Sequence, residues 1–559
     1  MFGSSAFAMS SHDTCGRLIT STRSAVTAPP FVVPARGDAP VGGVVPPMAT
    51  PATMTAIAKR GKKCSRRRGA SPATPAPRSC ALRGATPGFG VYPGVAAATS
   101  NSAVSFDGRV NERARGRGDR GVVFRGLGWN AIGYPLNVGL LFASHSLASN
   151  ILPKRGFGSY SLAFTIFVTT ALIVQLGLPH SLLRRAATAL SSGDEHTAAH
   201  EVVSALAFGA VVGLVVGVFF GSPLGDEVLS LLFPATGVAA VALLIGIRTA
   251  LRVIENIVPE ALRAYRDFFR VMIFDGLLAN LLFTGALVVI LVTSDSSSVR
   301  ELMTVGAVVA VVALVPALLS VFTKIKGARA AGLRVRNPLE PSMWAVTIGR
   351  TILAQLDLLI VGMLAASRDV AQYAAPFRLG LLVGLPLIAF NQVVPALLAG
   401  WFAQGKLQRI ERVMRGTAGI ALFGSLALGI GFVLFGKAAL GTFFGDEYRG
   451  AYSILLVLSL GQILQTATGS CGFALMMTGH SRAYAQILGV SAVVTIGADV
   501  LFYDLWGLDG LAIATAGTLV LQNTVQAIAV KRLAGFSVWA NPRLALAEVQ
   551  RVLRRSEKD

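Results

Sequence analysis

From about residue 127 onward, the chain is a succession of apolar stretches, each about 20 residues long, separated by short loops with basic residues, glycine or proline. The stretch at 202–221, VVSALAFGAVVGLVVGVFFG, contains no charged side chain. A helix of about 20 apolar residues crosses a hydrocarbon core of about 30 Å. Because lipid offers the backbone no hydrogen-bond partners, such segments must be helices. We therefore expect an all-α, multi-pass membrane protein, and soluble enzyme folds are disfavoured.

The composition agrees with this expectation. Only 14% of the residues are charged, whereas soluble domains carry about 25%. Of the net charge of +22, a large share lies in residues 1–126, which hold 18 Lys/Arg and 5 Asp/Glu. The remaining excess falls in loops predicted to lie on one side of the membrane. The charge therefore does not predict a specific nucleic-acid partner.

No pattern predicts catalysis, a metal or another cofactor. The four cysteines form no CxxC and no paired Cys/His spacing, so neither a disulfide framework nor a zinc site is indicated. His196 and His200 are four residues apart but lack a supporting acidic motif. No phosphate-binding P-loop is present. We therefore do not expect an enzyme.

Residues 1–120 are rich in Ala, Pro, Ser, Gly and Arg and poor in acids, and we expect a disordered basic tail without a signal peptide. Three explanations remain open. The tail is an organelle targeting segment, or it rests on anionic lipid headgroups, or the true start codon lies near residue 122.

We place twelve membrane-spanning helices along the rest of the chain. Lys and Arg are concentrated in alternate loops, which predicts that both termini lie in the cytoplasm. We expect the protein in the plasma membrane. The predicted spans are 128–150, 158–180, 200–221, 228–252, 269–293, 301–323, 342–365, 374–399, 412–435, 451–477, 483–503 and 508–531.

The two halves of the chain resemble each other in layout. GSYSLAF begins the second span and AQYAAPF the eighth, and each of these helices ends in a short motif that contains proline. This order predicts two six-helix, pseudo-symmetric bundles with a substrate cavity between them, although Gly-rich apolar helices also resemble one another in general. The predicted domains are the tail, a bundle at 121–324, a basic cytoplasmic linker at 325–341, a bundle at 342–533 and a cytoplasmic tail at 534–559.

Several stretches, in order over residues 128–533, resemble the polysaccharide-export flippases of the multidrug/oligosaccharidyl-lipid/polysaccharide (MOP) superfamily. They are FGSYSLAFTIFVTTALIVQLGLPHSLLRRAA, LDLLIVGMLAASRDVAQYAAPFRL and GLDGLAIATAGT. The resemblance implies alternating access between two bundles and transfer of an isoprenoid-linked oligosaccharide from the inner to the outer leaflet. It also implies partners: the lipid-linked glycan, the bilayer, and a polysaccharide polymerase and glycosyltransferases of the same pathway.

Other functions are weighed against this one. A cation-coupled multidrug exporter of the same superfamily would need an aromatic pocket and a carboxylate cluster, whereas the deep carboxylates here are few and scattered. A flippase for the peptidoglycan precursor usually carries two additional helices. A membrane glycosyltransferase would need acidic residues in a large outer loop, and the predicted outer loops are short. A purely structural protein gives no reason for deep Arg and Asp residues.

Arg350 and Asp357 lie deep in the predicted seventh span. A charge at the bilayer centre costs about 3 kcal/mol on insertion scales, so it needs a partner or a function. Seven residues are about two helical turns, which places both side chains on one face. Either Arg350 holds a pyrophosphate or acidic sugar through its planar donor fork, or the two residues form an ion pair that fastens the helix.

The eighth span offers three further candidates for the cavity wall. Arg378 either contacts the substrate or extends toward the membrane surface. Asn391 and Gln392 either line the cavity or hydrogen-bond another helix.

Arg248 and Arg252 share a face at the end of the fourth span. They either attract the lipid phosphate at the cytoplasmic entrance or anchor the helix as inside-positive residues. Asp275, Asp499 and His145 are weaker candidates for coupling a proton or cation, against ordinary hydrogen bonds between helices.

Overall fold

The computed structural model describes residues 133–293, 297–325, 341–391, 394, 398, 401–402 and 404–545. The predictions for the tail at 1–120, for most of the linker at 325–341 and for Gln392 lie outside these residues. All described residues belong to one compact unit, Asn101–Asp559.

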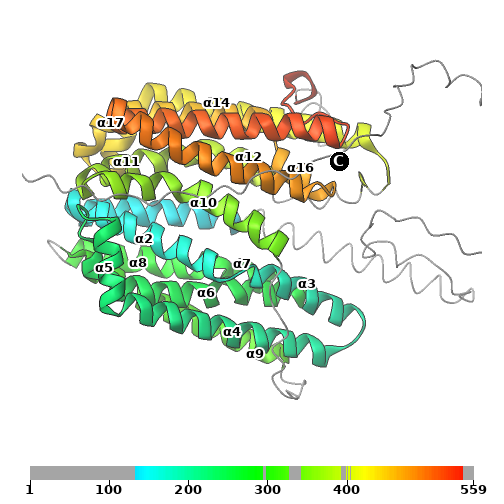
Figure 1. Ribbon diagram of the computed structural model, residues 1–559, viewed down its shortest axis with the longest axis horizontal. Helices are drawn as coiled ribbons and strands as arrows, with labels where there is room; N and C mark the ends of the chain where they lie inside the picture. The colour runs from blue at the N-terminus through cyan, green and yellow to red at the C-terminus, as the bar shows by residue number, and fades with distance from the viewer. Residues whose placement is uncertain are drawn as a thin grey trace, which may run out of the picture. The chain divides into compact units, whose positions relative to one another are not determined.

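The first half of the chain forms a bundle of helices, cyan to green in Figure 1. Its elements are a helix at 133–151, α2 (Lys154–Val174), α3 (Leu178–Ser191), α4 (Glu195–Phe220), α5 (Pro223–Leu232), the short η1 (Val238–Val241), α6 (Ala242–Ala264), α7 (Phe268–Met272), the π-helical turn η2 (Ile273–Leu277), α8 (Leu278–Thr293) and α9 (Val299–Ile325).

The second half forms a bundle drawn in yellow-green to red in Figure 1. Its elements are α10 (Pro341–Leu364), α11 (Ser367–Gly380), η3 (Leu381–Gly384), α12 (Leu385–Asn391), α14 (Leu407–Phe444), η4 (Asp446–Ala451), α15 (Tyr452–Thr468), α16 (Cys471–Met477) and α17 (Ser481–Leu533).

Nine helices in the described part of the chain are long and apolar enough to cross a membrane. One of them, α17, contains two spans, because its backbone breaks at Trp506 and Gly507. With α6 and the helix at 133–151, the predicted twelve spans are all accounted for. The described residues contain no strand. The all-α fold with two six-helix bundles is therefore confirmed.

The fourth span lies further along the chain than the predicted 228–252. α5 ends at Leu232, and a turn that contains Pro234 and a left-handed Gly237 (φ 64°) separates it from α6. α6 then continues to Ala264. Its charged residues belong to the span because they pair with one another inside the bundle, which a hydropathy pattern does not register.

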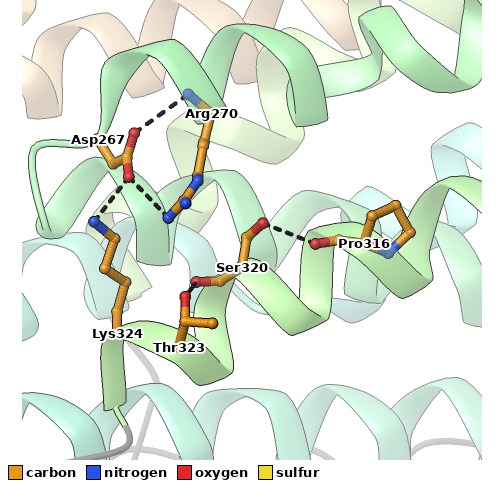
Figure 2. Close-up of polar contacts among 6 residues, drawn as sticks. All are labelled: Asp267, Arg270, Pro316, Ser320, Thr323 and Lys324. Atoms are coloured by element: carbon orange, nitrogen blue, oxygen red, sulfur yellow. Dashed lines mark hydrogen bonds and ion pairs between the residues drawn. The ribbon is translucent and has the colours of Figure 1, made fainter.

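Loop contacts fix the ends of several helices of the first bundle. Asp194 caps α4 by accepting hydrogen bonds from the Thr197 hydroxyl at 2.6 Å and from the Thr197 amide at 2.9 Å. These two hydrogen bonds lower the pKa of the Asp194 carboxyl. In Figure 2, Asp267 binds Lys324 of α9 at 2.8 Å and Arg270 at 3.2 Å. Burial acts to raise the pKa of Asp267, but the two cations outweigh it and the pKa is lowered. The α6–α7 turn is thereby tied to the end of α9.

The buried apolar residues divide into three clusters with different membership. One cluster combines residues of both bundles, among them Phe157 and Leu162 with Tyr373 and Tyr448. The second contains residues of the first bundle alone, and the third contains residues of the second bundle alone. The two bundles therefore share a core at one end only. We call this the sealed end, and we call the opposite end, with α3, the start of α10 and α16, the open end.

Candidate functional site

Side chains of the first bundle hydrogen-bond the backbone of the second at the sealed end. Asn150 donates to the Phe443 carbonyl at 2.9 Å, and Ser146 donates to the same oxygen. Lys154 donates to the Glu447 carbonyl at 3.0 Å. These contacts join the turn between the helix at 133–151 and α2 to the turn after α14.

Aromatic rings fill the same junction. Phe142 meets Phe443 edge-on with 5.3 Å between ring centroids, and Phe157 meets Tyr448 at 5.9 Å. Rings bury large apolar areas and prefer such edge-to-face pairs. The sealed end is therefore closed by apolar packing together with a few hydrogen bonds.

Two of the residues that define the sequence repeat lie in this junction. A Cβ atom at Gly158 of GSYSLAF would overlap the carbonyl oxygen of Ser367 at the start of α11. Ser159 and Ser367 both donate to the Thr236 carbonyl, at 2.6 and 2.7 Å. Glycine at position 158 thus permits the close approach of α2 and α11.

The second span breaks where α2 gives way to α3. Leu176 and Gly177 both have left-handed backbones, with φ of 52° and 77°, and Pro179 starts α3 in a position that suits proline. Trp344 of α10 donates its indole N–H to the Ile173 carbonyl at 3.2 Å. The break directs α3 along the open end, and the Trp344 hydrogen bond connects α10 to the end of α2 next to the break.

A cavity of about 870 Å³ lies between α3 and α10 at the open end. Its cationic or titratable lining residues are His180, Arg184 and Arg350, and its other polar groups include Thr188 and Gln355. None of the described lining residues is an Asp, a Glu, a Phe, a Tyr or a Trp. A cavity with this lining is suited to an anion and not to an organic cation.

Arg350 and Asp357 lie on the wall of a second cavity, but no ion pair joins them. The exposed Arg350 guanidinium lies 5.2 Å from the ring centroid of Phe473, whereas Asp357 is buried. The structure therefore shows no direct ion pair between these two side chains. Arg350 is left to face the cavities.

Asp499 of α17 lies near Asp357 and is fully buried. Neither of its carboxylate oxygens has a hydrogen-bond partner among the described residues. Tyr373 extends this polar group, because its hydroxyl lies 3.1 Å from that of Thr515. Two of the sequence candidates are thus brought together from α10 and α17.

Arg378 is buried at the sealed end and does not extend to the membrane surface. Its guanidinium stacks over Phe164 of α2 at 5.2 Å, and two of its nitrogens find no hydrogen-bond partner among the described residues. His145 lies against the same ring at 4.7 Å and is also buried. Arg248 approaches from α6 and stacks over Phe167 at 4.9 Å.

The remaining candidates have partners of their own. Arg248 and Arg252 share Glu255, at 3.5 and 3.2 Å, so their charge is partly neutralised. Asp275 is exposed in the kinked turn η2 and pairs with Arg263 at 3.3 Å. Neither arrangement resembles a buried coupling site.

Asn391 accepts a hydrogen bond from Ser470 and lines the second cavity. Gln392 lies outside the described residues.

Sequence reasoning missed the α3 contribution to the cavity. Arg184 falls in the loop between the predicted spans 158–180 and 200–221, and His180, at the end of the first of these spans, was not among the candidates. The LGLP sequence at Leu176–Pro179 was the available signal, because glycine followed by proline predicts a helix break that re-aims the next residues.

No protein-family model matches the chain. One relative, the probable low-salt glycan biosynthesis flippase Agl15 of Haloferax volcanii, is 22% identical over 181 residues. The match covers 32% of this chain and only 38% of the relative.

Solved structures match over far more of the chain. An inward-facing multidrug resistance MATE family transporter of the MOP superfamily gives a TM-score of 0.57 at 16% identity, over 71% of this chain and 94% of that one. A MOP superfamily transporter of Pyrococcus furiosus, for which reverse polarity of the binding pocket suggests a different function, gives 0.55 at 16% identity, over 74% and 95%. The chain is therefore a multi-pass membrane protein with the fold of the MOP superfamily of transporters.

Proposed function

We propose that this protein flips an isoprenoid-linked oligosaccharide from the cytoplasmic to the outer leaflet by alternating access between its two bundles. The observation that supports the proposal most strongly is the lining of the 870 Å³ cavity, which offers Arg184, Arg350 and His180 and no described carboxylate. A phosphate bound there would meet the planar donor fork of Arg350, which can bind two of its oxygens, in a cavity that also carries the positive charge of Arg184.

The distribution of basic loops sets the proposed orientation. Most of the described Lys and Arg residues near helix ends lie at the open end, so by the positive-inside rule we assign this end to the cytoplasm. The cavity then faces the leaflet in which the substrate is made, and both termini are cytoplasmic. The basic residues in question include Arg185, Arg263, Arg270, Lys324, Arg415 and Arg482.

The buried pair of carboxylates suits a role in coupling. Asp357 on α10 and Asp499 on α17 are near enough to repel each other as carboxylates, so binding a proton or a metal cation would relieve that repulsion. We assign to this pair the coupling of the conformational change to an ion gradient.

The same pair is what favours the alternative, a cation-coupled exporter of small molecules. An organic cation, however, would enter a cavity whose described lining carries two arginines and no Phe, Tyr or Trp ring. Like charges repel, and cation–π contacts need aromatic faces. The lining therefore favours the anionic substrate.

Arg350→Ala tests the proposed function in cells. Losing a charge-assisted contact worth about 1.5–3 kcal/mol should cut transport tenfold or more. Deleting the gene should abolish a surface glycan and leave its lipid-linked unit in the inner leaflet, and the variant should fail to restore export at normal protein abundance. Arg482→Ala, which alters an exposed arginine outside both cavities, is the matched control. Unchanged glycan with altered drug resistance would support the exporter instead.

A further inference from the structure

The second cavity lies inside the second bundle and has a volume of about 370 Å³. It is enclosed by α10, α12, α15, α16 and α17, and it shares Arg350 and Ala354 with the larger cavity. Its volume falls in the range of small-molecule sites, about 300–1,000 Å³. A ligand could therefore occupy both cavities at once by passing Arg350.

Carboxamides dominate the polar lining of this second cavity. A carboxamide both donates and accepts hydrogen bonds, as a sugar hydroxyl does. Among the described lining residues, Asp357 is the only carboxylate and Arg350 the only base. Six carboxamides come from three helices: Asn391, Gln462, Gln465, Gln522, Asn523 and Gln526.

Half of these carboxamides are not used to hold helices together. Asn523 bonds the Leu519 carbonyl at 2.8 Å and Asn391 bonds Ser470. Gln462, Gln465 and Gln522, in contrast, have no side-chain hydrogen bond to another described residue.

Gln526 gives the clearest sign of an unfilled site. Its side chain is 2% exposed, and its amide nitrogen has no hydrogen-bond partner among the described residues. Its amide oxygen accepts only the weak Cys471 thiol, at 3.4 Å. A buried donor without an acceptor is costly, and a ligand in the cavity would supply the acceptor.

We infer that this cavity binds a neutral sugar residue of the glycan headgroup, an inference that rests on the proposed function. Carboxamides from three helices match hydroxyls that point in several directions, and the buried Tyr484 adds an aromatic face. A second anion would meet one base and one carboxylate, and an organic cation would meet one carboxylate and three aromatic rings but also the repelling Arg350 guanidinium. Arg350 lies at the border of the two cavities, where the sugar joins the phosphate.

The test uses the full chain in lipid nanodiscs and isothermal titration calorimetry. The probes are farnesyl diphosphate alone and farnesyl diphosphate linked to glucose, galactose, mannose, N-acetylglucosamine or glucuronic acid. At least one neutral-sugar probe should bind tenfold more tightly than farnesyl diphosphate. Gln526→Leu and the less buried Gln522→Leu should each erase that gain and leave the Kd of farnesyl diphosphate within about twofold. Gln486→Leu, an exposed glutamine on the same helix, is the control.

The outcomes separate this inference from the proposed function. If farnesyl diphosphate binds and Arg350→Ala weakens it, but no neutral sugar adds affinity or Gln522→Leu and Gln526→Leu leave the gain intact, the sugar site is refuted and the proposed function stands. A gain confined to the glucuronic acid probe also refutes a neutral-sugar site. If farnesyl diphosphate does not bind at all, the proposed function fails and this inference fails with it.

Discussion

At the sealed end the two bundles contribute to one apolar core, whereas at the open end each bundle packs around a core of its own. The two bundles therefore contact each other differently at their two ends. Interlocked rings such as Phe142 and Phe443 fill the sealed end. Small or polar residues such as Ala187, Thr188 and Thr351 line the open one.

Under the proposed function, this contrast indicates which contacts must change during transport. Cores packed around a single bundle can move as rigid bodies, because close-packed interiors resist deformation. The shared core and its few hydrogen bonds must come apart before the cavity can open on the other side. Three substitutions test this division, and each compares an effect on the junction with an effect inside a bundle.

Gly158→Ala should disturb the sealed end most. The new Cβ would overlap the Ser367 carbonyl oxygen, and overpacking costs about 1–3 kcal/mol. We expect the conformational equilibrium to shift tenfold or more away from the sealed state. Distances between spin labels at Thr188 and Thr351, measured after replacing the native cysteines, should shorten as the open end closes.

The control for this prediction is Gly139→Ala, because a Cβ at Gly139 meets no atom within 4 Å. If both glycine variants keep the wild-type distance distribution, the α2–α11 approach does not hold the junction shut.

Arg378→Leu should have the next largest effect, with opposite signs on stability and transport. The buried guanidinium lacks partners for two of its nitrogens, and replacing buried ionic groups by apolar ones often stabilises a protein by about 1–4 kcal/mol. The melting temperature should rise, and transport should slow because the sealed state becomes harder to open. A faster transporter with a lower melting temperature would contradict this account. Arg368→Leu, an exposed arginine on α11, should change neither quantity appreciably.

Asp267→Asn should have the smallest effect and should act within one bundle. The Lys324–Asp267–Arg270 contacts are partly exposed, so their loss should cost about 1 kcal/mol or less. Because the pKa of Asp267 is lowered, its stabilisation is present above the ordinary carboxyl pKa and disappears as the pH falls through the lowered value. The difference in melting temperature from wild type should therefore be greatest near neutral pH.

The spin-label distances of the Asp267→Asn variant should match those of the wild type. Asp226→Asn, on an exposed carboxylate of α5, should show no pH-dependent difference in melting temperature. A stability difference that persists at pH 2 would show that the carboxylate charge is not what holds the α6–α7 turn.

The spans could be predicted from the sequence because lipid demands long apolar helices. The fourth span was misplaced because Glu255, Glu260 and Arg263 lower the apparent hydropathy of its second half, although they form ion pairs within the bundle. Arg350 was recognisable as a cavity candidate from its depth alone. The second cavity was not recognisable, because each of its glutamines taken singly is equally well explained by a hydrogen bond between helices.

The break at Leu176 and Gly177 divides the second span into two helical segments with different neighbours. The first segment, α2, packs against α11. The second segment, α3, carries His180 and Arg184 on the cavity wall and buries Leu182 and Ala186 in the core of the first bundle. Under the proposed function, the break thus lets one span contribute to the sealed end through α2 and to the substrate cavity through α3.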